Sequence, residues 1–236
     1  RVLFRSRDCS IQRRNQKVIE EAPSPLLDET TRRKMGEQAV ALANAVNYDS
    51  AGTVEFVAGQ DKSFYFLEMN TRIQVEHPVT EMVTGIDLVR EMIRIAGGEP
   101  LRIRQDEVRV SGHSIEVRIN AEDPARNFLP NPGTVNALCV PGGDGVRFDS
   151  MLYQGYTVPP FYDSLLGKLI VHDKDRPSAI RRLERALAEL NVEGIFTTKP
   201  LHQALARDAD VKAGRFHTAW LEPWLESHAA GLATAQ

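Results

Sequence analysis

The sequence predicts an α+β protein built as two units, with mostly antiparallel strands. In three stretches apolar residues recur every three or four positions, which is typical of amphipathic helices. In others, apolar and polar residues alternate or flank a tight turn, which is typical of strands and hairpins. The alternation dominates only after Pro100. We therefore place a boundary near residues 101–107 and expect a first unit over 1–106, a second over 107–226 and a tail over 227–236.

Composition and charge exclude several classes of protein. Of the 236 residues, 42% are hydrophobic and 26% are charged, as in ordinary globular proteins. The 29 basic and 32 acidic side chains give a formal net charge of −3, so we expect no nucleic-acid partner. We find no apolar run of about 18 residues and no secretory signal, so we expect no membrane association. The two cysteines fit a reducing compartment, and we expect a cytoplasmic location.

The first unit is expected to contain two helices and a β-hairpin. Asp28 can cap a helix that ends within residues 47–52. Its apolar positions are Met35, Ala39, Leu42, Ala43 and Val46. Runs rich in β-forming residues over 52–58 and 63–69 are separated by Gly59-Gln60-Asp61, which is a hairpin signal. A second helix stops at Gly97-Gly98. Its apolar positions are Ile86, Val89, Ile93 and Ala96.

The second unit is expected to begin with half-buried strands and to end in a helix and a tail. Apolar residues alternate with polar ones at Val108, Val110, Ile115, Val117 and Ile119. Turns over 131–133 and 141–145 and a loop over 158–160 separate further short strands. A helix starts at Pro177 and ends by Gly194, with Ile180, Leu183, Leu187 and Leu190 on one face. Residues after Leu225 are expected to fray.

One segment carries an unusual set of polar side chains. If residues 68–76 are extended, alternate side chains share one face. These side chains are Glu68, Asn70, Arg72, Gln74 and Glu76. His77 precedes Pro78 and is expected to be extended as well. A solvated face of an amphipathic strand is an equally simple interpretation, but the face lacks lysine and threonine, the usual solvent-facing residues. Its acids, amides and cation favour a ligand-binding strip.

The hairpin adds a second acid to this strip. With the turn centred on residues 60–62, Glu55 falls close to opposite Glu68. Two facing carboxylates repel each other unless a cation lies between them. Glu55, Glu68 and Asn70 supply the oxygen ligands that Mg²⁺ prefers and leave positions for phosphate oxygens. The alternative is an exposed hairpin with its acids in water. We favour the metal site.

Other polar residues have simpler interpretations. The basic cluster of Arg13, Arg14 and Lys17 is expected in a solvated turn. Arg118 lies on the polar side of a strand, where Glu116 or Glu122 could pair with it. The histidines show no shared metal-binding spacing.

Taken together, the motifs resemble those of the biotin carboxylases. The matching segments are residues 7–17, 66–72, 73–81, 118–124 and 161–164. The similarity extends from Arg7 to about Trp224, and motifs of this length are specific. The resemblance implies the carboxyl-terminal half of an ATP-grasp domain, an antiparallel sheet with helices, followed by a biotin carboxylase C-terminal α+β domain.

The resemblance also implies an activity: ATP- and bicarbonate-dependent carboxylation of biotin on a separate carrier protein. The cofactors would be ATP, Mg²⁺ or Mn²⁺, and biotin. The parent enzyme would be an acyl-CoA carboxylase of the acetyl-CoA or propionyl-CoA type. The partners would be the biotin carboxyl carrier protein and a carboxyltransferase, with a second copy in a homodimer.

Carried over by position, the resemblance assigns residues to each ligand. Glu55, Glu68 and Asn70 would gather the metal on the ATP phosphates, and Gln12 and Asn15 would lie beside the nucleotide. Bicarbonate would be surrounded by Lys17, Arg72, Gln74, Val75 and Glu76, and Arg118 would lie near the biotin ring. Glu76 would take the bicarbonate proton, Arg72 and Lys17 would hold the anions, and Arg118 would stabilise the enolate-like oxygen of biotin.

Two departures from the family leave alternatives open. Many biotin carboxylases have histidine where Asn15 stands, and asparagine resembles the acyl-CoA carboxylase α-subunits. The glycine-rich lid of the ATP site is not in this sequence, so we expect a fragment that binds Mg·ATP weakly by itself. One alternative is a docking or dimerising fragment without catalysis. Another is an ATP-grasp ligase of the carbamoyl-phosphate-forming type, which activates bicarbonate but needs no biotin near Arg118.

Overall fold

A computed structural model describes residues 2–4 and 6–233 of the protein. The chain divides into two compact units. Unit 1 comprises residues 1–8 and 21–112, and unit 2 comprises residues 9–20 and 113–236. The segment 9–20 thus folds with the second half of the chain, although it precedes most of unit 1 in the sequence.

Unit 1 is a β-hairpin with helices before and after it. Its elements are α1 (Glu29–Ala45), β3 (Thr53–Ala58), β4 (Phe64–Asn70), α2 (His77–Thr84), α3 (Leu88–Ala96) and the 3-10 turn η1 (Gln105–Glu107). The predicted start of α1 is confirmed, because Asp28 Oδ1 accepts a hydrogen bond from Thr31 N at 2.8 Å. The predicted hairpin is confirmed as well, and Gly59 N donates to Ser63 O across its turn at 2.8 Å.

Helix α2 stands where an extended segment was predicted, and helix α3 buries other residues than those predicted. His77 is the first residue of α2 and not part of an extended run. The main-chain N–H of His77 donates to Gln74 O at 3.2 Å, which closes a turn, and Pro78 is tolerated in the first helical turn because its missing N–H is not needed there. Helix α3 is confirmed, but its apolar residues Val89 and Ile93 are 42% and 68% exposed. Its buried positions are Leu88 and Glu91.

Unit 2 is built on a five-stranded sheet in the order β1-β2-β5-β12-β10. Its strands are β1 (Asp8–Arg13), β2 (Gln16–Ala22), β5 (His113–Asn120), β10 (Val146–Ser150) and β12 (Leu165–Asp173). Short strands form two-stranded ladders beside it: β6 (Glu122–Asp123), β7 (Leu129–Pro130), β8 (Gly133–Thr134), β9 (Ala137–Cys139), β11 (Thr157–Val158) and β13 (Asn191–Glu193). The helices are the 3-10 turn η2 (Pro124–Arg126), α4 (Arg176–Glu189), α5 (Lys199–Arg207), α6 (Ala209–Ala213) and α7 (Leu221–Ala233).

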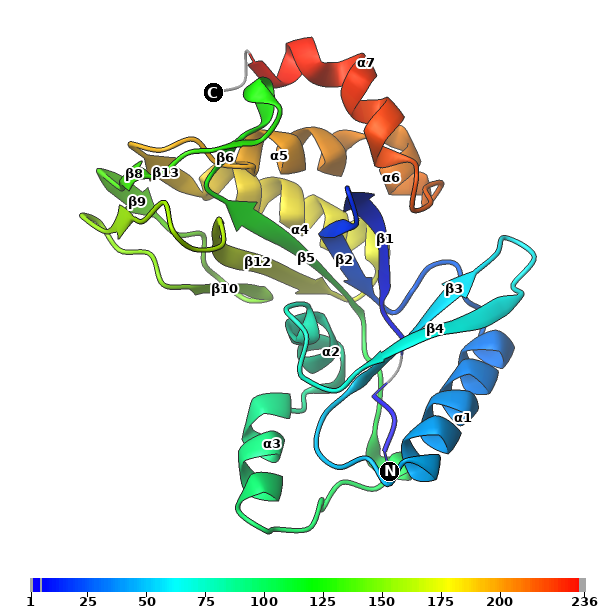
Figure 1. The fold of residues 1–236 in the computed structure, drawn as a ribbon. Coiled ribbons are helices and arrows are strands. Elements are labelled where there is room, and N and C mark those ends of the chain that lie inside the picture. The colour runs from blue at the N-terminus through cyan, green and yellow to red at the C-terminus, as the bar shows by residue number, and fades with distance from the viewer. Residues whose placement is uncertain (1, 5, 234–236) are drawn as a thin grey trace. The chain divides into compact units, whose positions relative to one another are not determined.

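The main hydrophobic core lies between one face of this sheet and the helices of unit 2. Figure 1 shows α4 along β5 and β12, with α5 beside α4. Val117 and Ile119 of β5 meet Leu183 and Leu187 of α4 in one buried cluster. Residues 113–117 are all buried, so the prediction of a half-buried strand is wrong here. The reason is the position of β5 between β2 and β12 in the middle of the sheet.

Three features of the chain differ from the sequence-based prediction. Residues 8–22 form the β1–β2 hairpin, whereas residues 108–110 form no strand. The expected fraying after Leu225 is wrong for residues 226–233, because α7 continues to Ala233 and Leu232 is only 2% exposed. Residues 234–236 of the predicted tail lie outside the described residues. Trp220 and Trp224 of this region pack at 5.9 Å between ring centroids and belong to the main hydrophobic core. Within residues 2–4 and 6–233, no helix has the length and apolar character needed to cross a membrane.

Candidate functional site

The residues indicated by the sequence fall into two groups. Unit 1 holds those of the polar strip and its hairpin: Glu55, Glu68, Asn70, Arg72, Gln74, Val75 and Glu76. Unit 2 holds Gln12, Asn15, Lys17 and Arg118.

The two acids of the hairpin are paired as the turn spacing predicts. Glu55 of β3 lies directly opposite Glu68 of β4 in the antiparallel ladder. The register shifts just beyond this pair, where Phe56 faces Phe66. Such a bulge changes the direction of the side chains that follow. The paired acids therefore lie on one side of the bulge, and the paired aromatic residues lie on the other.

Asn70 joins the two acids. Its Nδ2 donates to Glu55 Oε1 at 3.1 Å and to Glu68 Oε1 at 3.0 Å. Gln74 Nε2 donates to the same Glu55 oxygen at 2.5 Å, and Arg72 Nη2 donates to Asn70 Oδ1 at 3.4 Å. The acids and amides of the predicted strip are therefore brought into one hydrogen-bonded cluster.

The cluster suits a hard cation by its donor set. Glu55 and Glu68 each direct a carboxylate oxygen to the Asn70 amide nitrogen, and the Asn70 amide oxygen accepts from Arg72, so the three side chains place carboxylate and amide oxygens in one cluster. Oxygen ligands of this kind are those Mg²⁺ takes while keeping positions for water and phosphate. In the described part of the chain, no three His, Cys, Asp or Glu side chains gather as a metal site. Any cation bound here would accordingly depend on the asparagine as its third protein ligand.

The strip is not one continuous strand, which corrects the prediction. Strand β4 ends at Asn70, and residues 71–76 turn into the N-terminus of α2. Arg72 is exposed, whereas Gln74 and Glu76 are 5% and 2% exposed. Val75 is half-buried in the last turn before the helix. The side chains meet through hydrogen bonds around the turn and not through strand alternation.

Arg7 organises the buried end of the cluster and was not singled out by the sequence. Its Nη2 donates to Gln74 Oε1 at 2.7 Å and to Thr53 Oγ1 at 3.0 Å, and its Nη1 donates to Thr80 Oγ1 at 3.3 Å. The same Nη2 lies 4.0 Å from Glu76 Oε1. These partners are 46 to 73 residues away, so no local spacing could have indicated them. The only signal was the position of Arg7 at the start of a matching motif.

The second group surrounds the β1–β2 hairpin of unit 2. Arg14 and Asn15 occupy its turn with φ of 47° and 65°, a conformation that asparagine tolerates well. Both are exposed, which agrees with the predicted solvated turn. Gln12 Nε2 donates to Cys9 O at 2.8 Å, so this side chain folds back on its own strand.

Lys17 and Arg118 line one hollow of unit 2. The hollow is small and partly open to solvent, and it is also bordered by Glu122, Phe128 and His202. Gln12 and Asn15 do not border it. Of the four predicted residues in unit 2, the structure thus brings together the two that carry positive charge.

Arg118 is held at both its side chain and its main chain. Its Nε donates to Glu20 Oε1 at 2.7 Å and its Nη2 lies 2.5 Å from the same oxygen. Glu20, on the neighbouring strand β2, was not among the acids indicated by the sequence. The carbonyl of Arg118 accepts from Thr198 Oγ1 at 2.9 Å and lies 2.6 Å from His202 Nε2.

His202 is neutral at physiological pH. It is fully buried, and this burial lowers its pKa to about 4 against a weaker opposing effect of its bond to the Arg118 carbonyl. A carbonyl can only accept, so the proton resides on Nε2. The other ring nitrogen, Nδ1, is buried without a hydrogen-bond partner. His202 is therefore a fixed donor to the main chain of Arg118.

Known proteins resemble this chain along most of its length. Residues 116–223 match the family model of the biotin carboxylase C-terminal domain, and residues 1–104 match that of the carbamoyl-phosphate synthase L chain ATP-binding domain. The biotin carboxylase of Nostoc sp. is 56% identical over 216 residues, which are 92% of this chain and 48% of that protein. Biotin carboxylase 1 of Bacillus subtilis is 52% identical over 219 residues, which are 92% of this chain and 49% of that protein.

A solved structure extends the similarity to the fold. The biotin carboxylase domain dimer of the Hydrogenobacter thermophilus 2-oxoglutarate carboxylase, in complex with MgADP, ADP and bicarbonate, matches with a TM-score of 0.92 at 48% identity. The match covers 96% of this chain and 49% of that one. The chain spans about half the length of the curated relatives it matches. It contains the biotin carboxylase C-terminal domain over residues 116–223, preceded over residues 1–104 by the ATP-binding domain of the carbamoyl-phosphate synthase L chain type.

Proposed function

We propose that this chain is the carboxyl-terminal part of an ATP-dependent biotin carboxylase, a ligase that uses bicarbonate to carboxylate biotin on a carrier protein. The observation that carries the proposal is the opposed pair of Glu55 and Glu68, both bonded to Asn70. Facing carboxylates cost stability unless they serve a cation, and carboxylate-held Mg²⁺ is a common grip on nucleotide phosphates. The division into 1–106, 107–226 and a tail over 227–236 is part of the same proposal.

The cluster of unit 1 supplies the groups for the nucleotide and bicarbonate. Glu55, Glu68 and Asn70 would hold Mg²⁺, which when bound neutralises charge on the phosphates. Glu76 is the proposed base that takes the bicarbonate proton, and Arg72 the cation that orients the anions. Gln74 and the main chain at Val75 are proposed to contact bicarbonate. The bonds of Arg7 to Gln74 support this, because they fix the turn on which these groups lie.

The side chains that we propose to contact biotin, one further anion and the nucleotide lie in the β1–β2 hairpin and in the hollow of unit 2. Arg118 is proposed to stabilise the negative oxygen that develops on the ureido ring when biotin loses its N–H proton. Its guanidinium is already fixed by Glu20, and such preorganised charge lowers the barrier most. Lys17, in the same hollow, is proposed to hold an anion. Gln12 and Asn15 are proposed to contact the nucleotide, which rests on the family resemblance.

The partners follow from the proposed reaction. Biotin is carried by a separate carrier protein, and a carboxyltransferase takes the carboxyl group onward in an acyl-CoA carboxylase. A homodimer is supported by the Hydrogenobacter thermophilus domain, which is described as a dimer. The cytoplasm is the proposed location, since a chain with two cysteines is too poor in cysteine for a disulfide framework and fits a reducing compartment.

The test requires a whole enzyme, which we call the completed carboxylase. It consists of this chain joined to the part of the Nostoc biotin carboxylase that this chain does not match. We expect bicarbonate-dependent ATP hydrolysis and carboxylation of free biotin. Arg118→Ala is expected to lower biotin carboxylation by roughly 10²- to 10³-fold, the usual effect of losing one charge-stabilising donor, while ATP cleavage without biotin persists. Unchanged carboxylation in that variant would contradict the role of Arg118.

The same assay separates the alternative functions. A carbamoyl-phosphate-forming ligase would hydrolyse ATP with bicarbonate but would not respond to biotin. A docking fragment would give no turnover at all. The match of residues 116–223 to the biotin carboxylase C-terminal domain favours the biotin-dependent reaction.

A further inference from the structure

We propose that Glu20 is a positioning residue for Arg118, one that sets the orientation of the guanidinium toward biotin. The inference rests on the proposed function, because it concerns the same reaction. It adds a residue that neither the motifs nor the spacing of the sequence indicates.

The geometry of the pair supports this inference. Glu20 lies on β2 and Arg118 on β5, which are neighbours in the sheet. A single carboxylate oxygen, Glu20 Oε1, accepts from Nε at 2.7 Å and lies 2.5 Å from Nη2. Two contacts to one edge of the planar guanidinium fix both its position and the direction of its plane. Glu20 is 0% exposed and the Arg118 side chain is 19% exposed, so bulk water competes little for this bond.

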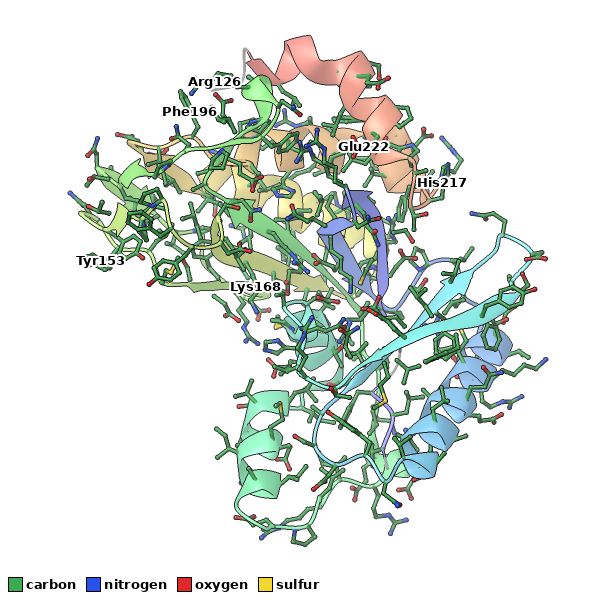
Figure 2. The ribbon with its side chains drawn as sticks, in the orientation of Figure 1. Arg126, Tyr153, Lys168, Phe196, His217 and Glu222 are labelled. Carbon is green, nitrogen blue, oxygen red and sulfur yellow. The ribbon has the colours of Figure 1, made fainter. Side chains whose placement is uncertain are left out.

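A lysine on strand β12 gives the Glu20 carboxylate a second effect on the position of Arg118. Lys168 of β12 lies directly opposite Arg118 of β5 in the ladder and is marked in Figure 2. Like charges in opposed positions repel each other. Lys168 has an acid of its own, with Nζ 3.8 Å from Asp149 Oδ2. Glu20 is thus the acid on the opposite flank from Lys168, and it draws the guanidinium away from that cation.

The main-chain contacts of Arg118 do not replace this function. Thr198 and His202 hold its carbonyl oxygen, which fixes the backbone of β5 at this position. The long side chain keeps several rotatable bonds beyond the backbone. The orientation of the guanidinium therefore depends on partners at its far end, and Glu20 contacts it twice.

A purely structural role is the competing interpretation. A buried ion pair contributes little net stability, but losing one partner can unfold a protein, so activity alone would not distinguish the two. The two interpretations differ in which step of the reaction is slowed: the cleavage of ATP with bicarbonate, or the carboxylation of biotin. A positioning residue for Arg118 affects the step that involves biotin and leaves bicarbonate-dependent ATP cleavage without biotin intact.

The experiment compares Glu20→Gln with the parent in the completed carboxylase. We expect biotin carboxylation to fall roughly 10- to 100-fold, as small misplacements of a catalytic group do, with unchanged ATP cleavage in the absence of biotin. Asp173→Asn is the matched control, since Asp173 Oδ2 also accepts from both Nε and Nη2 of one arginine, Arg182, at 3.1 and 2.7 Å. The control is expected to retain carboxylation within about twofold, because this half-buried pair includes none of the residues of the candidate site.

A double variant tests whether Glu20 acts through Arg118. If it does, adding Glu20→Gln to Arg118→Ala causes no further loss of carboxylation, because interacting residues are not additive. Additive losses overturn the inference, and so does a Glu20→Gln enzyme with parental carboxylation.

If Glu20→Gln does not fold, Glu20→Asp keeps the charge on a shorter side chain and is expected to lower biotin carboxylation while leaving ATP cleavage without biotin unchanged. Equal loss of both half-reactions in Glu20→Asp overturns the inference. A completed carboxylase without any bicarbonate-dependent ATP turnover overturns the proposed function, and the inference with it.

Discussion

Glu55 and Glu68 face each other across the β3–β4 ladder, and both carboxylates accept from the amide nitrogen of Asn70. Without a cation the two like charges oppose the pairing of the strands, and with one they become its ligands. The stability of the hairpin and its affinity for metal should therefore respond in opposite directions when one charge is removed.

Glu68→Gln tests this opposition. Because it removes one of two facing charges, it is expected to raise the free energy of unfolding of the metal-free chain by roughly 0.2–1 kcal/mol. It should also reduce the extra stability that the chain gains from added Mg²⁺. Urea denaturation in the presence of EDTA and of Mg²⁺ measures both effects. Glu99→Gln, which alters an exposed pair with Arg102, should change neither, and a less stable Glu68→Gln chain in EDTA would show that the repulsion is absent.

His202 makes the stability of the chain dependent on pH. Its pKa is lowered to about 4 by burial, so the folded chain favours the neutral ring. This contribution is fully present above about pH 6.5 and is lost as the pH falls toward 4. On this basis the free energy of unfolding at pH 5 should be about 2 kcal/mol lower than at pH 7 from this group alone. His202→Gln does not titrate and should show a smaller difference between the two pH values in urea denaturation. An identical difference in both proteins would exclude His202 as the cause.

Thr198→Val removes two hydrogen bonds at the main chain of β5. Thr198 Oγ1 donates to Arg118 O at 2.9 Å and accepts from Asn120 N at 3.0 Å, and the residue is 4% exposed. Valine has nearly the same shape but removes the side-chain acceptor of the Asn120 N–H and leaves the Arg118 carbonyl with its contact to His202, at a cost of about 1–3 kcal/mol. Thr198→Ser keeps the hydroxyl and should lose clearly less stability in the same urea titration. Equal losses would mean that the methyl group matters more than the hydrogen bonds.

Arg7→Lys tests how the cluster of unit 1 is held together. The guanidinium donates to Gln74, Thr53 and Thr80 at once, and an ammonium cannot reproduce this planar fork. Amide hydrogen exchange in residues 74–80 is therefore expected to become faster, with a loss of roughly 1–3 kcal/mol in stability. Arg33→Lys alters an exposed pair with Glu37 and should leave this exchange unchanged. Unaltered protection in Arg7→Lys would place the ordering of the turn elsewhere.

Local signals predicted much of the fold. Asp28 marked the start of α1, the short turn paired Glu55 with Glu68, and the apolar stripe containing Leu183 and Leu187 indicated α4. Each of these features depends on residues a few positions apart, within one helical turn or one hairpin. The candidate site could be predicted to the same extent, since Glu55, Glu68, Asn70 and Gln74 do meet in one cluster.

The sequence by itself determined the chemical groups of this protein and the local elements that carry them. The tertiary structure alone decided which distant groups meet: Arg7 bonds to Gln74 across 67 residues, and Arg118 bonds to Glu20 across 98. It also decided that the strip bends at residues 71–76 instead of continuing as a strand. The physical reason is that periodicity and turn preference act between near neighbours, whereas these contacts arise from strand order and chain packing, which no short pattern encodes.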